Sequence, residues 1–187
     1  ARLIEAQEPQ GIARRFLDKN WPSPSLEAQL GNLADSIAYN AHDIDDGVRS
    51  GLLQVEQLED VPLFSAYHAQ AVQDFPQLRQ EPKRWLYETI RLMLSAQIYD
   101  VIDVTRQNIA MHQPASAEEV RQIPPLVRFS APMQQQSVQM KQILFKNLYC
   151  QPVVKNTTDL AWQVITDVFH SYRAHPQTMK TEVVPRR

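Results

Sequence analysis

The chain has 187 residues, 43% hydrophobic and 21% charged, with a formal net charge of −2. This length suits one globular domain, and the near-neutral balance does not indicate a nucleic-acid-binding surface, which needs clustered Lys and Arg. The single cysteine excludes an intramolecular disulfide and a cysteine-rich zinc site. No apolar run approaches the roughly 18–20 residues of a membrane-spanning helix, and the first ten residues do not resemble a signal peptide. We therefore expect a soluble cytoplasmic protein with no membrane partner.

Glycine and proline usage points to one fold class. The chain has four glycines and 13 prolines. So few glycines leave little material for tight hairpins or phosphate-binding loops, which argues against a P-loop and a Rossmann fold. The prolines divide the chain into helix-length pieces. The sequence therefore predicts an all-α fold, and because no repeat or composition shift occurs, we expect residues 1–187 to form a single all-helical region.

The predicted elements follow in chain order. Residues 1–24 hold a possible short helix around 3–6 and are otherwise interrupted by proline. Ser23 followed by Pro24 is typical of a helix N-cap, so the next helix should run from about residue 25 to between 47 and 51. Further helices are predicted over 60–76, 81–112, 133–152 and 157–176, and a proline stops each of the last two. One helical turn is expected around 116–121.

The helix predicted over about 25–50 has two faces. Aliphatic residues recur at helical spacing and point to one side: Leu26, Leu30, Leu33, Ile37, Ile44 and Val48. The remaining surface carries polar residues that could bind a ligand: Asp35, Tyr39, His42, Asp43 and Asp46. A charged face is usually only the solvent side of a helix, but here Arg49 is the one cation between Lys19 and Arg79. Carboxylates with so few cations suit a divalent metal ion or sugar hydroxyls.

The spacing on this helix does not make a metal site by itself. The segment DIDDG is no EF-hand loop, because with Asp43 as the first position the glycine comes one residue early and Gln54 replaces the bidentate glutamate. Asp35 and His42 would lie about 10 Å apart along the helix, too far to bind one ion together. Any metal site here needs ligands from elsewhere.

Two blocks of sequence carry a family resemblance. Residues 24–53, PSLEAQLGNLADSIAYNAHDIDDGVRSGLL, resemble a block of the bacterial deoxyguanosinetriphosphate triphosphohydrolase-like proteins, a branch of the HD-domain phosphohydrolases. Residues 127–154, VRFSAPMQQQSVQMKQILFKNLYCQPVV, resemble a later block, and the helix predicted over 81–112 fits the segment between them. The resemblance covers most of residues 20–175 and implies an all-helical HD-type phosphohydrolase fold.

The resemblance also implies roles for individual residues. Such enzymes bind a divalent metal ion, such as Mg²⁺ or Mn²⁺, through a histidine, a His-Asp pair and a final aspartate, which Asp35 matches. Tyr39 and Asp43 match positions that contact the deoxyribose, the ring on the sugar and the carboxylate on its 3′-hydroxyl. The dipeptide His42-Asp43 aligns with this sugar-binding block and not with the metal-binding pair. We therefore expect His42 and Asp46 only to support the pocket.

The remaining candidates rest on weaker patterns. Lys141 is a candidate phosphate contact, although cations at helical spacing are more often solvated, and the same holds for Arg91, Arg128 and Lys146. Aromatic residues in helical register are predicted to lie in the core: Phe129, Phe145, Tyr149 and Trp162. Cys150 is predicted to be a packed thiol without a nucleophilic role. The histidines after residue 42 have no ligand-like partners in sequence.

The function implied by the resemblance is hydrolysis of a deoxynucleoside triphosphate to a deoxynucleoside and tripolyphosphate, by a homo-oligomer. No histidine precedes Asp35, so the upstream metal ligands are missing and we expect this chain to be the C-terminal part of such an enzyme, inactive alone. Two alternatives remain open. One is a helical interaction or regulatory module that retains the fold without catalysis, and the other is an HD phosphohydrolase acting on another nucleotide.

Overall fold

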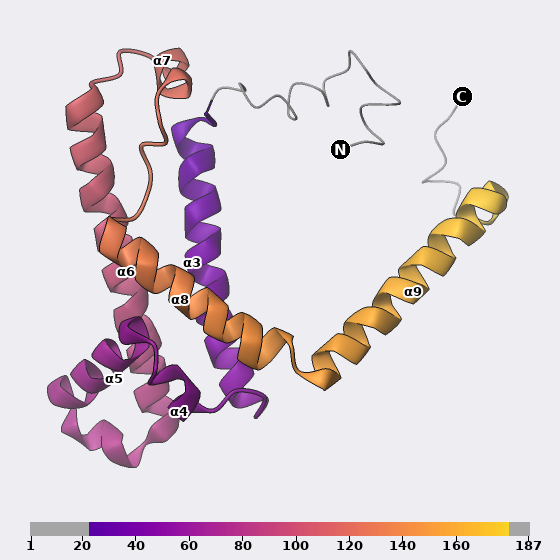
Figure 1. Cartoon of the computed structure of the whole chain (residues 1–187), viewed down its shortest axis with the longest axis horizontal. Coiled ribbons are helices and arrows are strands. Elements are labelled where there is room, and N and C mark those ends of the chain that lie inside the picture. Colours follow the sequence, from indigo (N-terminus) through magenta and orange to yellow (C-terminus); the bar gives the residue numbers. More distant parts are fainter. Residues whose placement is uncertain (1–22, 180–187) are drawn as a thin grey trace.

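The computed structural model describes residues 23–179, which are organised as helices without any strand (Figure 1). The elements, in chain order, are α3 (Leu26–Arg49), α4 (Val55–Leu58), α5 (Pro62–Asp74), η1 (Pro76–Gln80), α6 (Pro82–His112), α7 (Ala117–Gln122), α8 (Ala131–Leu144), η2 (Phe145–Tyr149), α9 (Pro152–Ala174) and η3 (Pro176–Thr178). The predicted all-α fold is confirmed. None of the helices between residues 23 and 179 has an apolar stretch that could cross a bilayer. The short helix expected around residues 3–6 lies outside the described residues.

The start of α3 differs from its prediction by two residues. The N-cap is Ser25, whose hydroxyl accepts a hydrogen bond from the Ala28 amide at 3.4 Å. Ser23 was expected in this role, but its amide and hydroxyl donate to the carbonyls of Arg121 and Ile123, at 2.7 and 3.0 Å. The prediction was wrong because a tertiary contact with the end of α7 competes with local capping. The far end of α3, at Arg49, lies within the predicted range.

The main hydrophobic core lies where α3, α5, α6 and α8 meet. Ile44 of α3, Phe64 of α5, Met93 of α6 and Met140 of α8 are almost completely buried there. Each such side chain contributes roughly 1.5–3 kcal/mol relative to an exposed position. A smaller cluster joins the middle of α3 to α6 and to the segment before α8: Ile37, Val101, Val127 and Phe129. These contacts hold α3 and α8 against one another.

One polar contact sets where α8 begins. The carboxylate of Asp100, on α6, accepts from the amide and the hydroxyl of Ser130, at 2.8 and 2.5 Å. The same Ser130 hydroxyl accepts from the Met133 amide and caps α8. Because a cap satisfies an otherwise free helix N–H group, the start of α8 is tied to α6. From there α8 runs across α3 (Figure 1).

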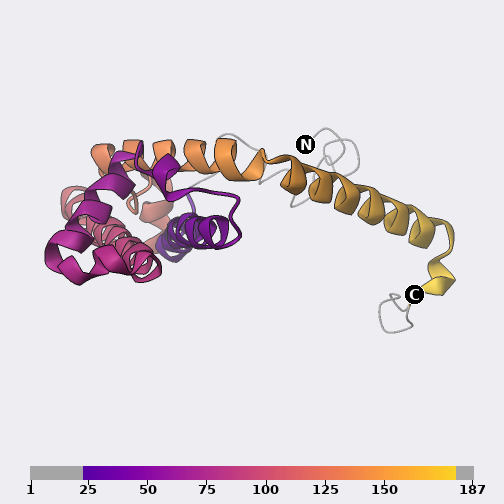
Figure 2. The ribbon, with the colours of Figure 1, turned by 90° about the horizontal axis from the view of Figure 1, so that it is seen from below.

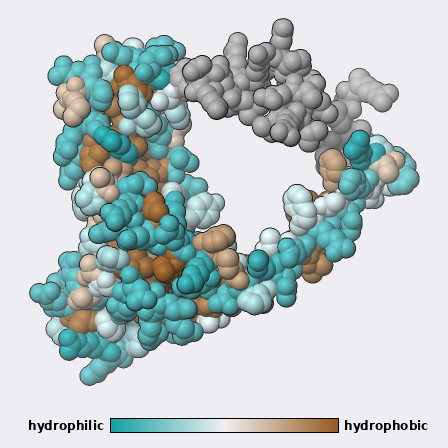
Figure 3. Space-filling view, in the orientation of Figure 1, coloured by the Kyte–Doolittle hydropathy of each residue, from teal (hydrophilic) through white to brown (hydrophobic). Residues whose placement is uncertain are grey.

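α9 leaves the helical body after the π-helical turn η2 and projects away from it (Figures 1 and 2). It begins at Pro152, five residues earlier than predicted, because a proline at the first helical position starts a helix as readily as it stops one. No residue of α9 is buried. Hydrophobic side chains reach the surface both on α9 and on the body (Figure 3).

The aromatic residues assigned to the core divide into two groups. Phe129 is buried, as predicted. Trp162 is 72% exposed on α9, and Phe145 and Tyr149 are 64% and 46% exposed on η2. Cys150, which follows Tyr149 in sequence, is exposed as well. These core assignments were wrong, because helical spacing shows which residues share a face but not whether another element covers that face.

Candidate functional site

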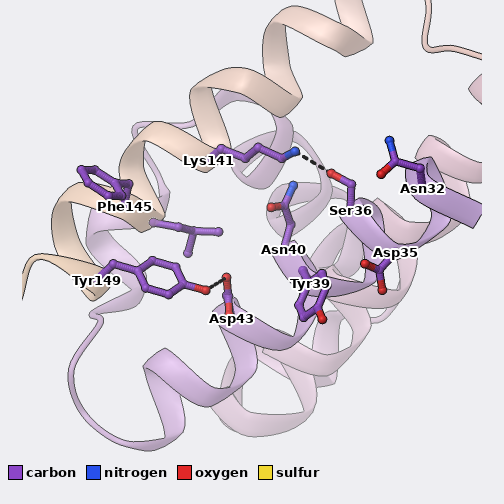
Figure 4. Close-up of a pocket in the computed structure, with 10 residues that line it drawn as sticks. Asn32, Asp35, Ser36, Tyr39, Asn40, Asp43, Lys141, Phe145 and Tyr149 are labelled. Atoms are coloured by element: carbon purple, nitrogen blue, oxygen red, sulfur yellow. Dashed lines mark hydrogen bonds between the residues drawn. The ribbon is translucent and has the colours of Figure 1, made fainter. Parts of the chain in front are cut away.

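A cleft of about 320 Å³ lies between α3 and the end of α8 with η2 (Figure 4). It contains most of the polar side chains that the sequence predicts to bind a ligand. Ten residues line it: Asn32, Asp35, Ser36, Tyr39, Asn40, Asp43, Lys141, Leu144, Phe145 and Tyr149. We treat this α3–α8 cleft as the candidate functional site.

The α3 wall of the cleft follows from helical spacing. Ser36, Asn40 and Asp43 are four and three residues apart, so their side chains lie along one stripe of the helix. Asp35 and Tyr39 each precede a member of this stripe and are exposed beside it, Tyr39 to 61%. With Asn32, the helix thus presents two carboxylates, two amides, a hydroxyl and a phenol to the same space.

The opposite wall comes from α8 and η2. Lys141, Phe145 and Tyr149 are spaced by four residues. The Lys141 and Tyr149 side chains extend toward α3, and the Phe145 ring lies at the outer edge of the cleft (Figure 4). Phe145 and Tyr149 begin and end the π-helical turn. A π turn inserts extra backbone into a helix and is often found at functional sites. Here it ends α8 with two aromatic rings at the edge of the cleft.

Two hydrogen bonds join the walls across the cleft. The Lys141 ammonium donates to the Ser36 hydroxyl at 2.5 Å, and the Tyr149 phenol donates to Oδ2 of Asp43 at 2.7 Å. Their partners are 105 and 106 residues apart in sequence. Oδ1 of Asp43 has no partner among residues 23–179 and remains able to accept from a ligand hydroxyl.

The bond to Asp43 changes the acidity of the phenol. The pKa of Tyr149 is raised to about 12, first because the phenol donates to the Asp43 carboxylate and then because of partial burial and the nearby negative charge. The phenol is therefore protonated throughout the physiological range and acts as a donor, which orients the Asp43 carboxylate.

The groups in the cleft support three kinds of contact. Carboxylates accept hydrogen bonds from hydroxyls or bind cations, a lysine ammonium attracts phosphate, and exposed aromatic rings such as Tyr39 and Phe145 can pack on the apolar face of a sugar. A ligand with a sugar and phosphate groups matches this combination.

Four of the residues singled out from the sequence meet in the cleft: Asp35, Tyr39, Asp43 and Lys141. Neither His42 nor Asp46 lines it. His42 is exposed on the outer side of α3, and Asp46 accepts from Arg49 at 2.8 Å. Pocket support by these two residues stays a prediction.

The other cations proposed for phosphate lie elsewhere. Arg91 pairs with Glu88 along α6, and Arg128 donates to the side-chain oxygen of Asn108 at 3.2 Å. Lys146 is exposed and is not among the cleft-lining residues. Lys141 is thus the basic residue that lines the cleft.

The metal ion implied by the resemblance needs more ligands than the described part of the chain supplies. No group of three or more His, Cys, Asp or Glu side chains between residues 23 and 179 is placed to hold a metal ion. Asp35 offers one exposed carboxylate. Residues 23–179 therefore do not form a complete metal centre by themselves.

Sequence reasoning missed Ser36, Asn40 and Tyr149. Ser36 and Asn40 share a stripe with Asp43, so the spacing of α3 could have placed them beside it. Tyr149 lies eight residues after Lys141, which on a continuous α-helix puts the two side chains about 80° apart around the axis, within one half of the surface. That α8 faces the polar side of α3, however, is not contained in either local pattern.

Comparison with known proteins agrees with the resemblance. Residues 127–186 match a family described as phosphohydrolase-associated domain. Deoxyguanosinetriphosphate triphosphohydrolase-like proteins are similar over most of this chain. The protein from Bordetella pertussis is 41% identical over 174 residues, covering 93% of this chain and 44% of the relative, and the one from Ralstonia pickettii is 44% identical over 168 residues, covering 90% and 42%.

A more distant relative from Rhizobium etli is 39% identical over 158 residues, covering 84% of this chain. The chain therefore spans less than half the length of the curated relatives it matches. The predicted resemblance is confirmed.

Proposed function

Because the chain is homologous to deoxyguanosinetriphosphate triphosphohydrolase-like proteins over most of its length, we propose that the protein containing it hydrolyses a deoxynucleoside triphosphate to a deoxynucleoside and tripolyphosphate. The observation that carries this proposal is the cleft itself. Asp35, Tyr39 and Asp43, chosen together from one helix face and its family resemblance, line it with Lys141, chosen separately as a candidate phosphate contact.

The substrate contacts follow from the chemistry of the two walls. Oδ1 of Asp43 accepts from the 3′-hydroxyl while Tyr149 holds the carboxylate through Oδ2. The Tyr39 ring packs on the deoxyribose, and the Lys141 ammonium binds the phosphates. Fixing the sugar on one side and the phosphates on the other orients the bond to be cleaved, and such positioning accounts for a large part of enzymatic rate enhancement.

A divalent metal ion would supply Lewis acidity in this reaction, with Asp35 as one of its ligands. The other ligands have to come from outside residues 23–179. An apolar groove of about 450 Å³ between α3 and α6 supports this arrangement. Its walls include Ala34, which directly precedes Asp35 in sequence, and Ala38, which lies on the next turn of α3. Small side chains allow another helix to approach closely, so a segment from the region of the relatives that this chain does not span would pack beside Asp35.

We therefore place this chain in the C-terminal part of a longer enzyme and expect it to bind metal weakly and not to turn over alone. The preferred deoxynucleoside triphosphate is left open, because no base-contacting residue is identified. Assembly into a homo-oligomer and a cytoplasmic location stay predictions of the resemblance.

The test compares variants of the whole protein that contains this chain. Asp35→Asn should lower turnover of deoxynucleoside triphosphates by about a hundredfold or more, because it removes a ligand charge at the reaction centre. Asp103→Asn, at an exposed position of α6 outside the cleft, should leave turnover unchanged. Release of tripolyphosphate is measured by ion chromatography. Release of pyrophosphate or orthophosphate instead, or full activity of Asp35→Asn, would contradict the proposal.

The absence of a three-ligand metal cluster from the described residues favours one rival, a helical interaction module without catalysis. A third possibility is hydrolysis of another nucleotide. A panel of deoxynucleoside triphosphates, ribonucleoside triphosphates and monophosphates separates them. No hydrolysis of any member supports the module, and a preference outside the deoxynucleoside triphosphates supports the third possibility.

A further inference from the structure

One buried polar group in the α3–α8 cleft has no partner. The side chain of Asn40 is 6% exposed, and its amide nitrogen makes no hydrogen bond within residues 23–179. Two other buried side-chain atoms in the described part also lack partners, on Gln97 and Thr105. Neither of those two residues lines this cleft, whereas Asn40 does. A buried N–H group without an acceptor destabilises the folded state, so its place on the cleft wall calls for a ligand.

The position of Asn40 indicates which part of a ligand it meets. It lies on the α3 stripe between Ser36 and Asp43, the two residues that make the cross-cleft hydrogen bonds. Its amide nitrogen points toward the link between Lys141 and Ser36, and not toward Tyr149 (Figure 4). An acceptor that reaches this nitrogen therefore also lies within reach of the Lys141 ammonium.

An anionic oxygen is the acceptor that fits both donors. A phosphate oxygen carries negative charge and can accept several hydrogen bonds at once, so an amide N–H and an ammonium can share it. We propose that Asn40 is a phosphate-binding residue, whose side-chain amide donates to a phosphate oxygen that Lys141 also binds. This inference rests on the proposed function, because it takes the triphosphate group as the ligand.

The Lys141 ammonium donates to the Ser36 hydroxyl. A hydroxyl is a weaker partner for an ammonium than a phosphate anion. When phosphate enters, Lys141 exchanges Ser36 for the anion and its flexible, exposed side chain moves, so that the amide of Asn40 becomes accessible. Ser36 thus holds Lys141 across the cleft until the ligand arrives.

The first test follows the amide directly in the unmodified chain. Side-chain amide resonances of the ¹⁵N-labelled chain are recorded while inorganic tripolyphosphate is added without metal, and the Asn40→Leu variant identifies the Asn40 signals by their loss. We expect the Asn40 signals to shift saturably and by more than those of Asn32, which lines the same cleft but is exposed. Lys141→Met should abolish the shift. Asn40 signals that do not move up to millimolar tripolyphosphate overturn the inference.

The second test separates ligand binding from a structural role. Asn40→Leu keeps the approximate shape of the side chain and removes the unpaired N–H group, so the ligand-free chain should melt at the same or a higher temperature. The same variant should bind tripolyphosphate about tenfold more weakly, the loss expected for one hydrogen bond to an anion. A residue with a purely structural role gives the opposite pattern, lower stability with unchanged binding, and that result would also overturn the inference.

The outcomes distinguish this inference from the proposed function. Hydrolysis by the whole protein without any shift of the Asn40 signals leaves the proposed function standing and removes Asn40 from the site. If the Asn40 signals shift saturably but the whole protein hydrolyses no nucleotide, the proposed function is wrong and the inference stands. The cleft then binds phosphate through Asn40 without serving catalysis.

Discussion

Tyr149 and Asp43 form the best-defined residue pair of the candidate site. Their hydrogen bond, at 2.7 Å, joins η2 to α3 and leaves one carboxylate oxygen of Asp43 available. The sequence predicted Asp43 through its family resemblance but placed Tyr149 in the core. The error is instructive, because a tyrosine in helical register packs equally well under another helix or at the edge of a cleft.

The raised pKa of Tyr149 predicts an effect of alkaline pH on stability. Folding raises the pKa of this phenol from 10.0 to about 12, so the folded state holds the proton more tightly than the unfolded state. The contribution of the bond is complete below about pH 10 and is lost as the pH rises toward 12. Between these values the wild-type chain should lose more stability than Tyr149→Phe, in urea unfolding at a series of pH values.

The matched control is Tyr99→Phe, which removes an exposed phenol on α6. It should follow the wild-type pH profile. Burial also raises the pKa of Tyr67, so the near-ultraviolet absorbance of tyrosinate should show a late-titrating phenol beside Tyr67 in this variant and the wild type, and that phenol should be missing from Tyr149→Phe. If the profiles of Tyr149→Phe and Tyr99→Phe coincide, the Tyr149–Asp43 bond does not persist in solution.

At the scale of elements, Gln29 explains why α3 keeps its place beside the segment before α8. Its side chain is buried, its oxygen accepts from the amides of Leu126 and Val127 at 2.9 and 3.1 Å, and its nitrogen donates to the carbonyl of Pro24 at 2.8 Å. One side chain thus satisfies three backbone groups from two segments that are about a hundred residues apart.

Gln29→Leu should therefore be costly. It leaves two buried backbone N–H groups without an acceptor, and each such group costs about 1–3 kcal/mol. We expect the free energy of unfolding to fall by about 2–4 kcal/mol, measured by urea denaturation. Gln107→Leu, at an exposed position of α6, serves as control and should change stability by no more than about 0.5 kcal/mol. Equal stability of the two variants would show that these bonds do not hold α3 in place.

Most helices could be predicted at this scale. The helices expected over 60–76 and 81–112 are found at Pro62–Asp74 and Pro82–His112, and the turn expected around 116–121 is α7. These succeeded because proline positions and apolar periodicity are local signals. The errors concern ends of helices, where a tertiary contact, an ambiguous proline or a change of helix type decides. They are the N-cap at Ser23, the start of α9, and the end of the helix expected over 133–152, where α8 ends at Leu144 and the π-helical turn η2 follows.

At the scale of the whole molecule, the described chain consists of a packed body and a projecting α9 (Figure 2). Because α9 buries none of its residues, it contributes little to the stability of the body. An amphipathic helix without a packing partner is marginally stable in water.

Removing α9 tests this division. A chain ending at Gln151 should melt within about 2 °C of the intact chain, followed by circular dichroism, and the intact chain should lose part of its helical signal before the main transition. A chain ending at Asn147 serves as contrast. It also lacks the buried Leu148 and the Tyr149–Asp43 bond and should melt clearly lower. A large loss of stability in the chain ending at Gln151 would mean that α9 packs on the body in solution.

The sequence by itself determined the helical class, most helix positions and the polar residues of α3. Helix formation and the faces of a helix depend on residues within a few positions of one another, so they can be read from a local pattern. The family resemblance added roles for Asp35, Tyr39 and Asp43, and these roles stay proposals.

Only the tertiary structure decided what faces those residues. The pairings of Lys141 with Ser36 and of Tyr149 with Asp43 join residues more than a hundred positions apart, and they depend on how α8 is anchored by Asp100 and crosses α3. The unpaired amide of Asn40 and the uncovered face of α9 are likewise absent from any local pattern. Burial and partnership are properties of the packed chain, because each depends on which distant element occupies the space beside a residue.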